Sequence, residues 1–410
     1  MAGDSGMMPA SANAIARLRS GNWPDRGFIR AAAAALLAIE LAISAFMVAG
    51  THGWIVPLAK PTGTDFVSFY AAGALANAGT PELVYNLAAH AAAEEAATER
   101  GVPYQFFNYP PVFLLICGPL ARLPYLAAFA VFEAATLALY LLVARRILGD
   151  PSGTALLVLV AFPLVFWTVG LGQNSFLTAA LFGGATLLVD RRPIVAGLLF
   201  GALSYKPHYG LLVPFALAAG RCWWALAAAA VSVGALALGS LAAFGSGTWH
   251  DFFVTAGAAH ALYETDWAPF YAFANPYGAV RQLGGSVPFA YALQGLTTLF
   301  AAALVVVVWR RAVPLPTRAA VLAAATPIAV PVSLYQDLML DAIAGAWLIR
   351  ECASSRPAGW EKTALACLYI LALYARHVAE YWTVPVFPIA AAAVVAIAAL
   401  RAWRERPVLL

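Results

Sequence analysis

Long apolar segments recur through most of this 410-residue chain, and they limit it to a few fold classes. Hydrophobic residues make up 62% of the sequence and charged residues 11%, whereas a soluble domain carries about 25% charged residues. A transmembrane helix needs about 20 mostly apolar residues. The sequence therefore predicts an all-α polytopic membrane protein with about 12 transmembrane helices. The predicted spans are 29–49, 124–144, 152–170, 174–190, 193–205, 207–220, 222–244, 288–309, 316–335, 337–350, 359–377 and 383–401.

One further apolar stretch is too short to cross a membrane. Residues 110–121 (PPVFLLICGPLA) begin with two prolines, which predicts a re-entrant or interfacial helix. The apolar run from Ala31 to Gly50 exceeds the core of a signal peptide, about 7–15 residues, and is interpreted as a retained first helix. We expect a cytoplasmic segment at 1–28, a single membrane domain at 29–403 and a cytoplasmic tail at 404–410.

The basic residues are distributed unequally between the two sides of the predicted bundle. With the N-terminus in the cytoplasm, 18 of the 24 Lys and Arg residues fall at cytoplasmic ends, as the positive-inside rule expects. Counting 110–121 as a span would move Arg145 and Arg146 outside, so the charges favour the re-entrant interpretation. We expect a multi-pass protein of the cytoplasmic (inner) membrane, whose net charge of +4 reflects orientation and not a nucleic-acid partner.

The unusual polar residues gather on the extracytoplasmic side. Two long loops are predicted there, 50–123 and 245–287, and the first contains two segments with the pattern of juxtamembrane helices, 65–78 and 81–100. Short polar turns between spans lie on the same side. A transporter would instead place polar groups near the midplane, often in repeated halves, and no convincing repeat is present. The sequence therefore predicts an active site that faces the periplasm or exterior.

Asp65 is the one carboxylate in a stretch of aromatic and small residues, Gly63–Tyr70. An acid held at a membrane surface is costly and usually has a function. We predict that Asp65 is a catalytic general base, which must lie near the acceptor hydroxyl. The alternative is that Asp65 only caps an interfacial helix, because Asp is a preferred N-cap residue.

Lys206 is a basic residue in a short turn on the side that the positive-inside rule disfavours. As a compact positive charge it is predicted to bind a phosphate. The alternative is a lysine whose ammonium only reaches for the aqueous interface. The flanking Tyr205 and His208 are predicted to add hydrogen bonds to the phosphate.

Other polar residues on this side are predicted to bind substrate. Gln173 and Asn174 lie in a glycine-rich turn, which leaves a purely turn-forming role open. Asp337 and Asp341 are spaced to share one helix face, where they could bind a sugar, a proton or a cation. The predicted substrate-binding residues are Tyr70, Asn108, Tyr109, Gln173, Asn174, Gln336, Asp337, His260 and His377.

Several short motifs occur in the order that is typical of one family. By the order of these motifs the chain resembles glycosyltransferase family 87, a family of polyprenol-phosphate-dependent mannosyltransferases. The resemblance runs from about residue 60 to 345. Family members often carry a histidine shortly before the aspartate that begins the tenth span. In this chain that aspartate is Asp337, and the preceding residues are Ser333-Leu334-Tyr335-Gln336. The function of that histidine is then absent here, moved to His377 or His260, or performed by Gln336. The matching motifs are Asp65-Phe66 with Tyr70 and Gly73, Tyr85, Tyr109-Pro110-Pro111, Gly172-Gln173-Asn174, Arg192-Pro193 with Ala196-Gly197, Lys206-Pro207, Asn275-Pro276 and Gln336-Asp337-Leu338.

The resemblance implies a GT-C-type membrane fold and an inverting transfer of a sugar, with mannose favoured. It implies a polyprenyl-phosphate sugar as donor, a lipid or glycan as acceptor, Asp65 as general base and Lys206 at the donor phosphate. We expect no cofactor and no metal if Lys206 stabilises the leaving phosphate, although Asp337 leaves a divalent cation open. The rival functions are a multi-pass transporter or lipid flippase of an envelope glycan pathway, and a non-catalytic assembly protein.

Overall fold

Helices form almost all of the regular structure in the computed structural model, which describes residues 25–57, 60–265, 268–354 and 359–404. The prediction of an all-α protein is confirmed. The longer helices are α2 (Arg26–Ala49), α6 (Tyr125–Leu148), α12 (Trp223–Tyr263), α14 (Val287–Arg310), α15 (Leu315–Ala329), α16 (Met339–Ser354), α17 (Gly359–Trp382) and α18 (Val386–Arg404). The shorter helices are α3 (Phe66–Asn77), α4 (Leu87–Ala97), α5 (Leu114–Leu120), α7 (Gly153–Val160), α8 (Pro163–Leu171), α9 (Ser175–Leu188), α10 (Pro193–Ala202), α11 (Val213–Ala219) and α13 (Pro276–Gln282). The 3₁₀ helices are η1 (Pro81–Tyr85), η2 (Pro111–Phe113), η3 (Leu203–Tyr205), η4 (Pro207–Gly210), η5 (Phe270–Ala272) and η6 (Tyr335–Leu338), and a small antiparallel hairpin pairs β1 (Ile55–Val56) with β2 (Lys60–Pro61).

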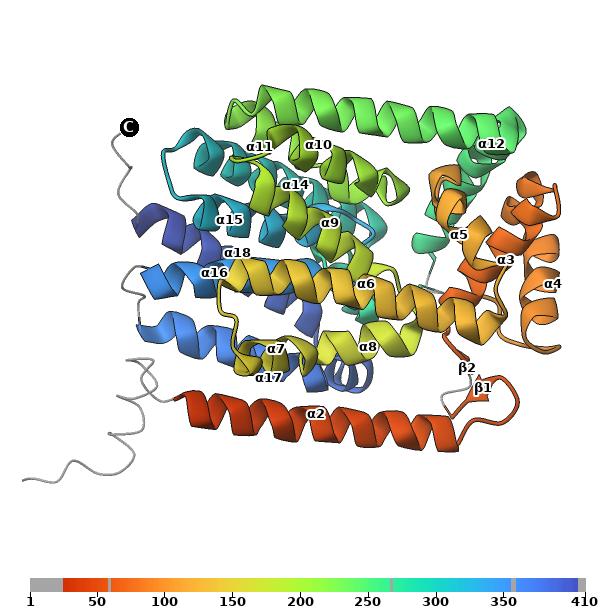
Figure 1. Ribbon diagram of the computed structural model, residues 1–410, viewed down its shortest axis with the longest axis horizontal. Helices are drawn as coiled ribbons and strands as arrows, with labels where there is room; N and C mark the ends of the chain where they lie inside the picture. Colours follow the sequence, from red (N-terminus) through yellow and green to blue (C-terminus); the bar gives the residue numbers. More distant parts are fainter. Residues whose placement is uncertain (1–24, 58–59, 266–267, 355–358, 405–410) are drawn as a thin grey trace, which may run out of the picture.

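The long helices run roughly along the longest axis of the molecule (Figure 1). The short helices α3, α4 and α5 and the hairpin gather at one end, where α6 begins. The opposite end holds the end of α6, the start of α12 and the turn between α14 and α15. Arginine pairs lie at two of these places, Arg145-Arg146 and Arg310-Arg311, so these pairs lie at the end of the bundle opposite α3, α4 and α5.

Within the described residues, five helices are long and apolar enough to cross a membrane, namely α2, α6, the Trp223–Ala258 part of α12, α14 and α18. The pair α7 and α8, bent by 51°, makes a sixth if it is one span. Other predicted spans correspond to shorter apolar helices such as α9, α10 and α15. The chain is therefore a membrane protein, as predicted, whereas the count of about 12 spans stays a prediction.

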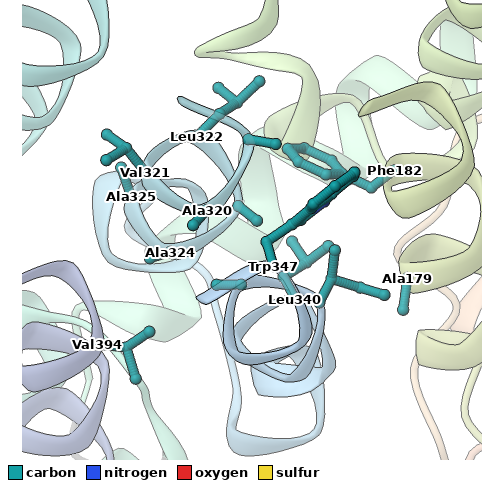
Figure 2. Close-up of a cluster of buried hydrophobic side chains, with 14 of the residues drawn as sticks. Ala179, Phe182, Ala320, Val321, Leu322, Ala324, Ala325, Leu340, Trp347 and Val394 are labelled. Carbon is teal, nitrogen blue, oxygen red and sulfur yellow. The ribbon is translucent and has the colours of Figure 1, made fainter. Parts of the chain in front are cut away.

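α15 forms the centre of the bundle. Nearly every residue from Thr317 to Ala329 is buried, and half of the buried residues are alanines, which let neighbouring helices approach closely. The buried side chain of Trp347, on α16, lies beside α15 and extends toward Phe182 of α9 (Figure 2). Its indole N–H donates to the hydroxyl of Thr186 at 3.1 Å, so the one polar group of this buried side chain is satisfied. A rigid core therefore holds α9 and α16, the helices whose first turns carry polar residues of the candidate site.

An aromatic cluster holds α3 at the end of the bundle. Phe66 and Phe69 are buried, with Phe66 packed 5.7 Å from Phe132 of α6 and Phe69 packed 5.0 Å from Phe113 (ring centroids). A Cβ on Gly73 would overlap the backbone of α5, so only glycine lets the two helices touch there. Helices thus form where juxtamembrane helices were predicted, as α3 and as η1 with α4. Their position at the membrane surface stays a prediction.

α12 continues beyond the predicted end of its span. Gly245 interrupts the helix with φ 81° and ψ 167°, a conformation open mainly to glycine, and the helix then resumes as far as Tyr263. The second part packs near η1, where the rings of Phe252 and Tyr85 lie 5.7 Å apart. The first part of the predicted loop 245–287 is therefore helical.

Candidate functional site

Asp65 precedes α3 and is held against the turn that follows α8. Its N–H donates to the carbonyl of Leu171 at 2.8 Å. Gly172 in that turn has φ 67°, and a Cβ there would overlap Phe66. Glycine is needed for both the backbone conformation and the close approach. The backbone therefore brings Asp65 directly beside Gln173.

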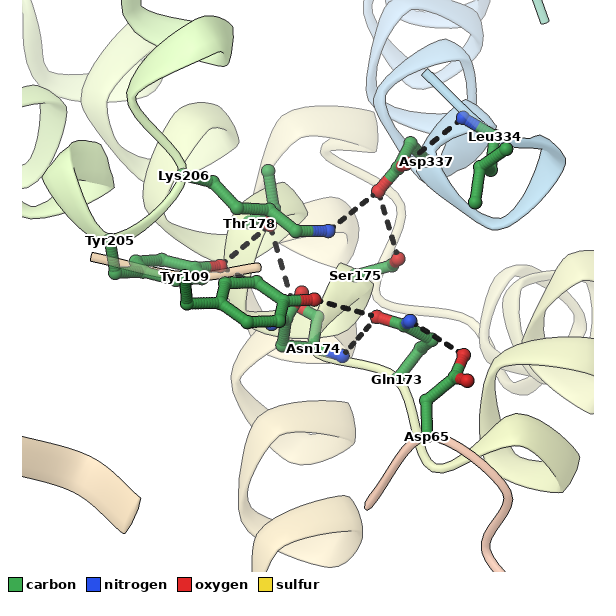
Figure 3. Close-up of polar contacts among 10 residues, drawn as sticks. All are labelled: Asp65, Tyr109, Gln173, Asn174, Ser175, Thr178, Tyr205, Lys206, Leu334 and Asp337. Atoms are coloured by element: carbon green, nitrogen blue, oxygen red, sulfur yellow. Dashed lines mark hydrogen bonds and ion pairs between the residues drawn. The ribbon is translucent and has the colours of Figure 1, made fainter. Parts of the chain in front are cut away.

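The partly buried carboxylate of Asp65 accepts a hydrogen bond from the side-chain amide of Gln173, with Nε2 and Oδ2 2.7 Å apart (Figure 3). Asp65 occupies the N-cap position of α3, yet its side chain makes no capping hydrogen bond to the described backbone of that helix. The capping alternative thus lacks its hydrogen bond. Burial raises the pKa of Asp65, and the Gln173 hydrogen bond and the charge of Lys206 oppose this effect.

Gln173 connects Asp65 to the rest of the site. Its Oε1 accepts hydrogen bonds from the Tyr109 hydroxyl at 3.5 Å and from the Asn174 N–H at 3.2 Å. An ionised carboxylate can only accept, so the amide nitrogen must face Asp65 and the amide oxygen must face Tyr109. Tyr109 is itself fixed because its carbonyl accepts from the Tyr85 hydroxyl at 2.8 Å.

Lys206 lies between η3 and η4, at the break that separates α10 from α11. Its Nζ is 2.8 Å from Oδ1 of Asp337, and only 6% and 7% of the two side chains are exposed. The ammonium also lies near the rings of Tyr109 and Tyr209, 5.8 and 5.6 Å from their centroids. A buried charge without a partner is strongly unfavourable, so each member of this pair needs the other.

Asp337 lies in η6, immediately before α16. Its Oδ2 accepts from the Leu334 N–H at 3.2 Å, and its Oδ1 accepts from the Ser175 hydroxyl at 3.4 Å (Figure 3). Burial opposes ionisation of Asp337, but Lys206 and the Tyr209 hydroxyl outweigh it and hold the pKa of this carboxyl below its usual value. Asp337 is therefore an ionised counter-ion at neutral pH.

Tyr205 and His208 flank this ion pair in different ways. The Tyr205 hydroxyl lies 2.6 Å from the hydroxyl oxygen of Thr178 and also donates to the Asn174 carbonyl at 3.4 Å, so it is engaged with α9. His208 packs against Tyr209 with ring centroids 4.2 Å apart. Burial and then the Lys206 charge lower the pKa of His208 to about 4, so its imidazole is neutral at neutral pH.

The network brings together most, but not all, of the predicted residues. Gln336 is buried next to Asp337. The Tyr70 hydroxyl instead donates to the Leu123 carbonyl at 2.9 Å, and its side chain lines a separate groove of about 610 Å³. Two other predicted residues, Asn108 and His377, have exposed side chains, and the His377 ring packs on Tyr381. The side chain of His260 lies outside the described residues.

Sequence reasoning missed the partnership between Lys206 and Asp337, which were assigned separately to phosphate and substrate. It also missed Ser175 and Thr178, whose hydroxyls take part in the network from α9. A signal was present, because Lys206 and Asp337 are opposite charges in turns predicted on the same side of an apolar bundle. Such charges are usually buried as pairs.

The comparisons with known proteins give one match. A family model described as glycosyltransferase family 87 matches residues 106–333, which agrees with the resemblance drawn from the sequence. The matched segment contains Tyr109, Gln173 and Lys206, while Asp65 and Asp337 lie on either side of it. Comparison with curated proteins and with solved structures finds no match.

Removing one member of the buried ion pair should destabilise the protein. We expect Lys206→Met to lower the free energy of unfolding by about 3–5 kcal/mol, because Asp337 is left buried without its counter-ion. The double variant Lys206→Met/Asp337→Leu removes both charges and should recover most of that loss. Unfolding of the detergent-solubilised variants measures both effects. A double variant as unstable as the single one would contradict this account.

Proposed function

The chain belongs to glycosyltransferase family 87, whose model matches more than half of its length, and we propose that it moves a sugar from a polyprenyl-phosphate donor to a lipid or glycan acceptor. Family membership makes it a membrane glycosyltransferase. The observation that carries the finer proposal is that Asp65 and Lys206 meet at Tyr109: its hydroxyl donates to Gln173, the partner of Asp65, and its ring centroid lies 5.8 Å from the Lys206 ammonium. Inverting transfer needs a base at the acceptor hydroxyl and positive charge at the leaving group. Mannose is the favoured sugar.

Asp65 acts as the base in this proposal. Its carboxylate takes the proton from an acceptor hydroxyl, whose oxygen forms a bond to the anomeric carbon of the donor sugar. The bond between that carbon and the phosphate oxygen breaks, polyprenyl phosphate leaves, and the anomeric configuration inverts. The raised pKa of Asp65 makes it a stronger base than an exposed aspartate, while Gln173 keeps one carboxylate oxygen in place.

Lys206 stabilises the leaving phosphate in this proposal. An ammonium has three N–H donors, and the hydrogen bond to Asp337 uses one of them. Asp337 therefore holds the ammonium in a fixed position while its other donors can serve a phosphate oxygen. The pair carries no net charge before the donor binds, so Lys206 is buried without an uncompensated charge. The neutral imidazole of His208 is a further donor near the same atoms.

In the proposal, the lipid tail of the donor enters an apolar cavity of the protein that lies next to these polar residues. A cavity of about 140 Å³ lies among α6, α7, α8, α16, α17 and α18. Its lining includes Leu338, directly after Asp337, and is mostly apolar, with Asp341 as its carboxylate. If the donor phosphate lies at Lys206, the isoprenoid chain attached to it would therefore reach apolar side chains within about one helical turn of Asp337. In the proposal this cavity receives the first units of the chain.

The proposed orientation places the network on the extracytoplasmic side of the cytoplasmic membrane. Its support is the separation seen along the bundle, with arginine pairs at one end and α3, α4 and α5 at the other. By the positive-inside rule the arginine-rich end is cytoplasmic. Asp65 would then face the periplasm or exterior, together with a preassembled lipid-linked donor.

Sugar transfer by the purified protein tests the donor class and the base together. Incubation with radiolabelled polyprenyl-phosphate sugars and a membrane lipid extract should give a labelled lipid, detected by thin-layer separation. Asp65→Asn should lower kcat by about 10²–10⁴-fold, because an amide cannot take the proton, and leave donor binding near normal. Transfer retained by Asp65→Asn would contradict the assignment of Asp65 as the base. Absence of transfer by the native protein from every such donor would contradict the proposed donor class.

The acidic limb of the pH–rate profile should depend on Gln173. The base works only when deprotonated, so the raised pKa of Asp65 places this limb at a higher pH than an exposed aspartate would. Gln173→Met removes the hydrogen bond that lowers this pKa, so the limb of kcat/KM should move to still higher pH. Tyr109→Phe keeps the Gln173–Asp65 bond and should leave the limb in place. A limb that moves equally in both variants would contradict the assignment.

Filling the apolar cavity should discriminate between donors of different chain length. Gly345 lines the cavity, and a Cβ there would meet open space, so Gly345→Phe is expected to occupy it. KM for a long-chain donor should rise about tenfold, equivalent to about 1.4 kcal/mol, whereas a donor with a tail too short to enter should keep its KM. Gly234→Phe, on α12 and also facing open space, is the matched control. Equal effects on both donors would argue against this tail site.

A further inference from the structure

A histidine and a glutamate are completely buried on α4, outside the network described above. His90 and Glu94 are each 0% exposed, four residues apart on one helix face, with Nδ1 and Oε1 3.5 Å apart. Burying two titratable side chains is costly unless both find partners. Each of them contacts a different segment that leads to the candidate site.

His90 contacts the start of α3. Its Nε2 lies 3.2 Å from the carbonyl oxygen of Ser68, and because a carbonyl can only accept, Nε2 must carry the hydrogen. Ser68 in turn donates from its hydroxyl to the Asp65 carbonyl at 2.8 Å and from its N–H to the same oxygen at 3.2 Å. His90 is therefore linked through one residue to the backbone of the proposed base.

Glu94 contacts the segment that carries Tyr109. Its two carboxyl oxygens lie 3.0 and 3.3 Å from the backbone nitrogen of Gln105, which donates to them. The ring of Phe107, two residues further on, packs against both His90 and Tyr109, at 6.1 and 5.4 Å. Glu94 therefore fixes the beginning of the segment whose tyrosine contacts Gln173.

The pair is electrically neutral at neutral pH. Burial lowers the pKa of His90 to about 4, against the Ser68 hydrogen bond, and burial raises the pKa of Glu94 to about 8. The Ser68 carbonyl keeps the hydrogen of the imidazole on Nε2, and the Glu94 carboxyl lies 3.5 Å from the other ring nitrogen. The adjacent side chains thus contact α3 on one side and the 105–109 segment on the other.

We propose that the His90–Glu94 pair positions Asp65 and Tyr109 on either side of Gln173. The inference rests on the proposed role of Asp65 as general base, and it makes His90 a positioning residue that acts through Ser68. Misplacing a reacting group by about 1 Å can cost on the order of 10²-fold in rate. Loss of the link should therefore slow the chemical step and leave substrate binding nearly unchanged.

Two substitutions of His90 separate its hydrogen bond from its packing. His90→Gln keeps an N–H donor close to the position of Nε2, whereas His90→Phe keeps a ring against Tyr104 and Phe107 but has no donor. We expect kcat to fall about tenfold or more in His90→Phe, with KM for donor and acceptor within about twofold, and to recover in His90→Gln. Equal kcat values in the two variants would overturn the proposal, as would a proportional rise in KM.

Ser68→Ala tests the link itself and remains informative if a His90 variant fails to fold. It deletes the hydroxyl that bonds to the Asp65 carbonyl and leaves α4 unchanged, so kcat should fall several-fold at constant KM. Wild-type kcat in both Ser68→Ala and His90→Phe would overturn the proposal. Glu95→Gln, on the next residue of α4, is the matched control because that side chain caps only the Gly101 N–H and should leave both constants unchanged.

The outcome separates this inference from the proposed function. Absence of sugar transfer by the native protein, or full activity of Asp65→Asn, would mean that the proposed function fails. Transfer by the native protein that needs Asp65 but is indifferent to His90→Phe and to Ser68→Ala would mean that only the positioning inference fails.

Discussion

The buried ion pair between Lys206 and Asp337 is the interaction on which the candidate site depends. Two charges with side chains only 6% and 7% exposed are stable only as partners, so the break between α10 and α11 must stay against the start of α16. The Ser175 hydroxyl and the Leu334 N–H also donate to this carboxylate. The pair thereby fixes α9, whose preceding turn presents Gln173 to Asp65.

Much of the fold could be predicted because membrane-spanning helices are specified by composition alone. The apolar run at 29–49 became α2, and the patterned segment 65–78 became α3. The kink at Gly245 could not be predicted, because a glycine in an apolar run is compatible with a continuous helix, a kink or an end. There the outcome depends on packing against η1, which is distant in the sequence.

The residues of the candidate site could largely be predicted from the sequence, whereas the contacts between them could not. Asp65, Gln173 and Lys206 stood out as polar residues in an apolar chain. The structure joins Asp65 to Gln173 by a hydrogen bond and places Lys206 near the ring of Tyr109, which also contacts Gln173. The contact between Asp65 and Gln173 joins residues more than 100 positions apart, which no local pattern encodes. It arises from the tight turn at Gly172, where the absence of a Cβ admits the α3 backbone. His90 escaped notice because a helix rich in alanine and glutamate is typical of an exposed surface.

Environment assigns different roles to the two carboxylates of this network. Asp337 meets a full positive charge, so its pKa falls and it stays ionised as a counter-ion with little basicity. Asp65 meets a neutral amide, and the Gln173 hydrogen bond and the more distant charge of Lys206 offset its burial only in part, so its pKa rises. Two acids whose pKa values are driven apart in this way can serve one reaction without competing for the same proton. The charge of Lys206 lowers the pKa of Asp65 and that of Asp337 raises it, and burial outweighs both, so Asp65 keeps the basicity that the proposed transfer requires.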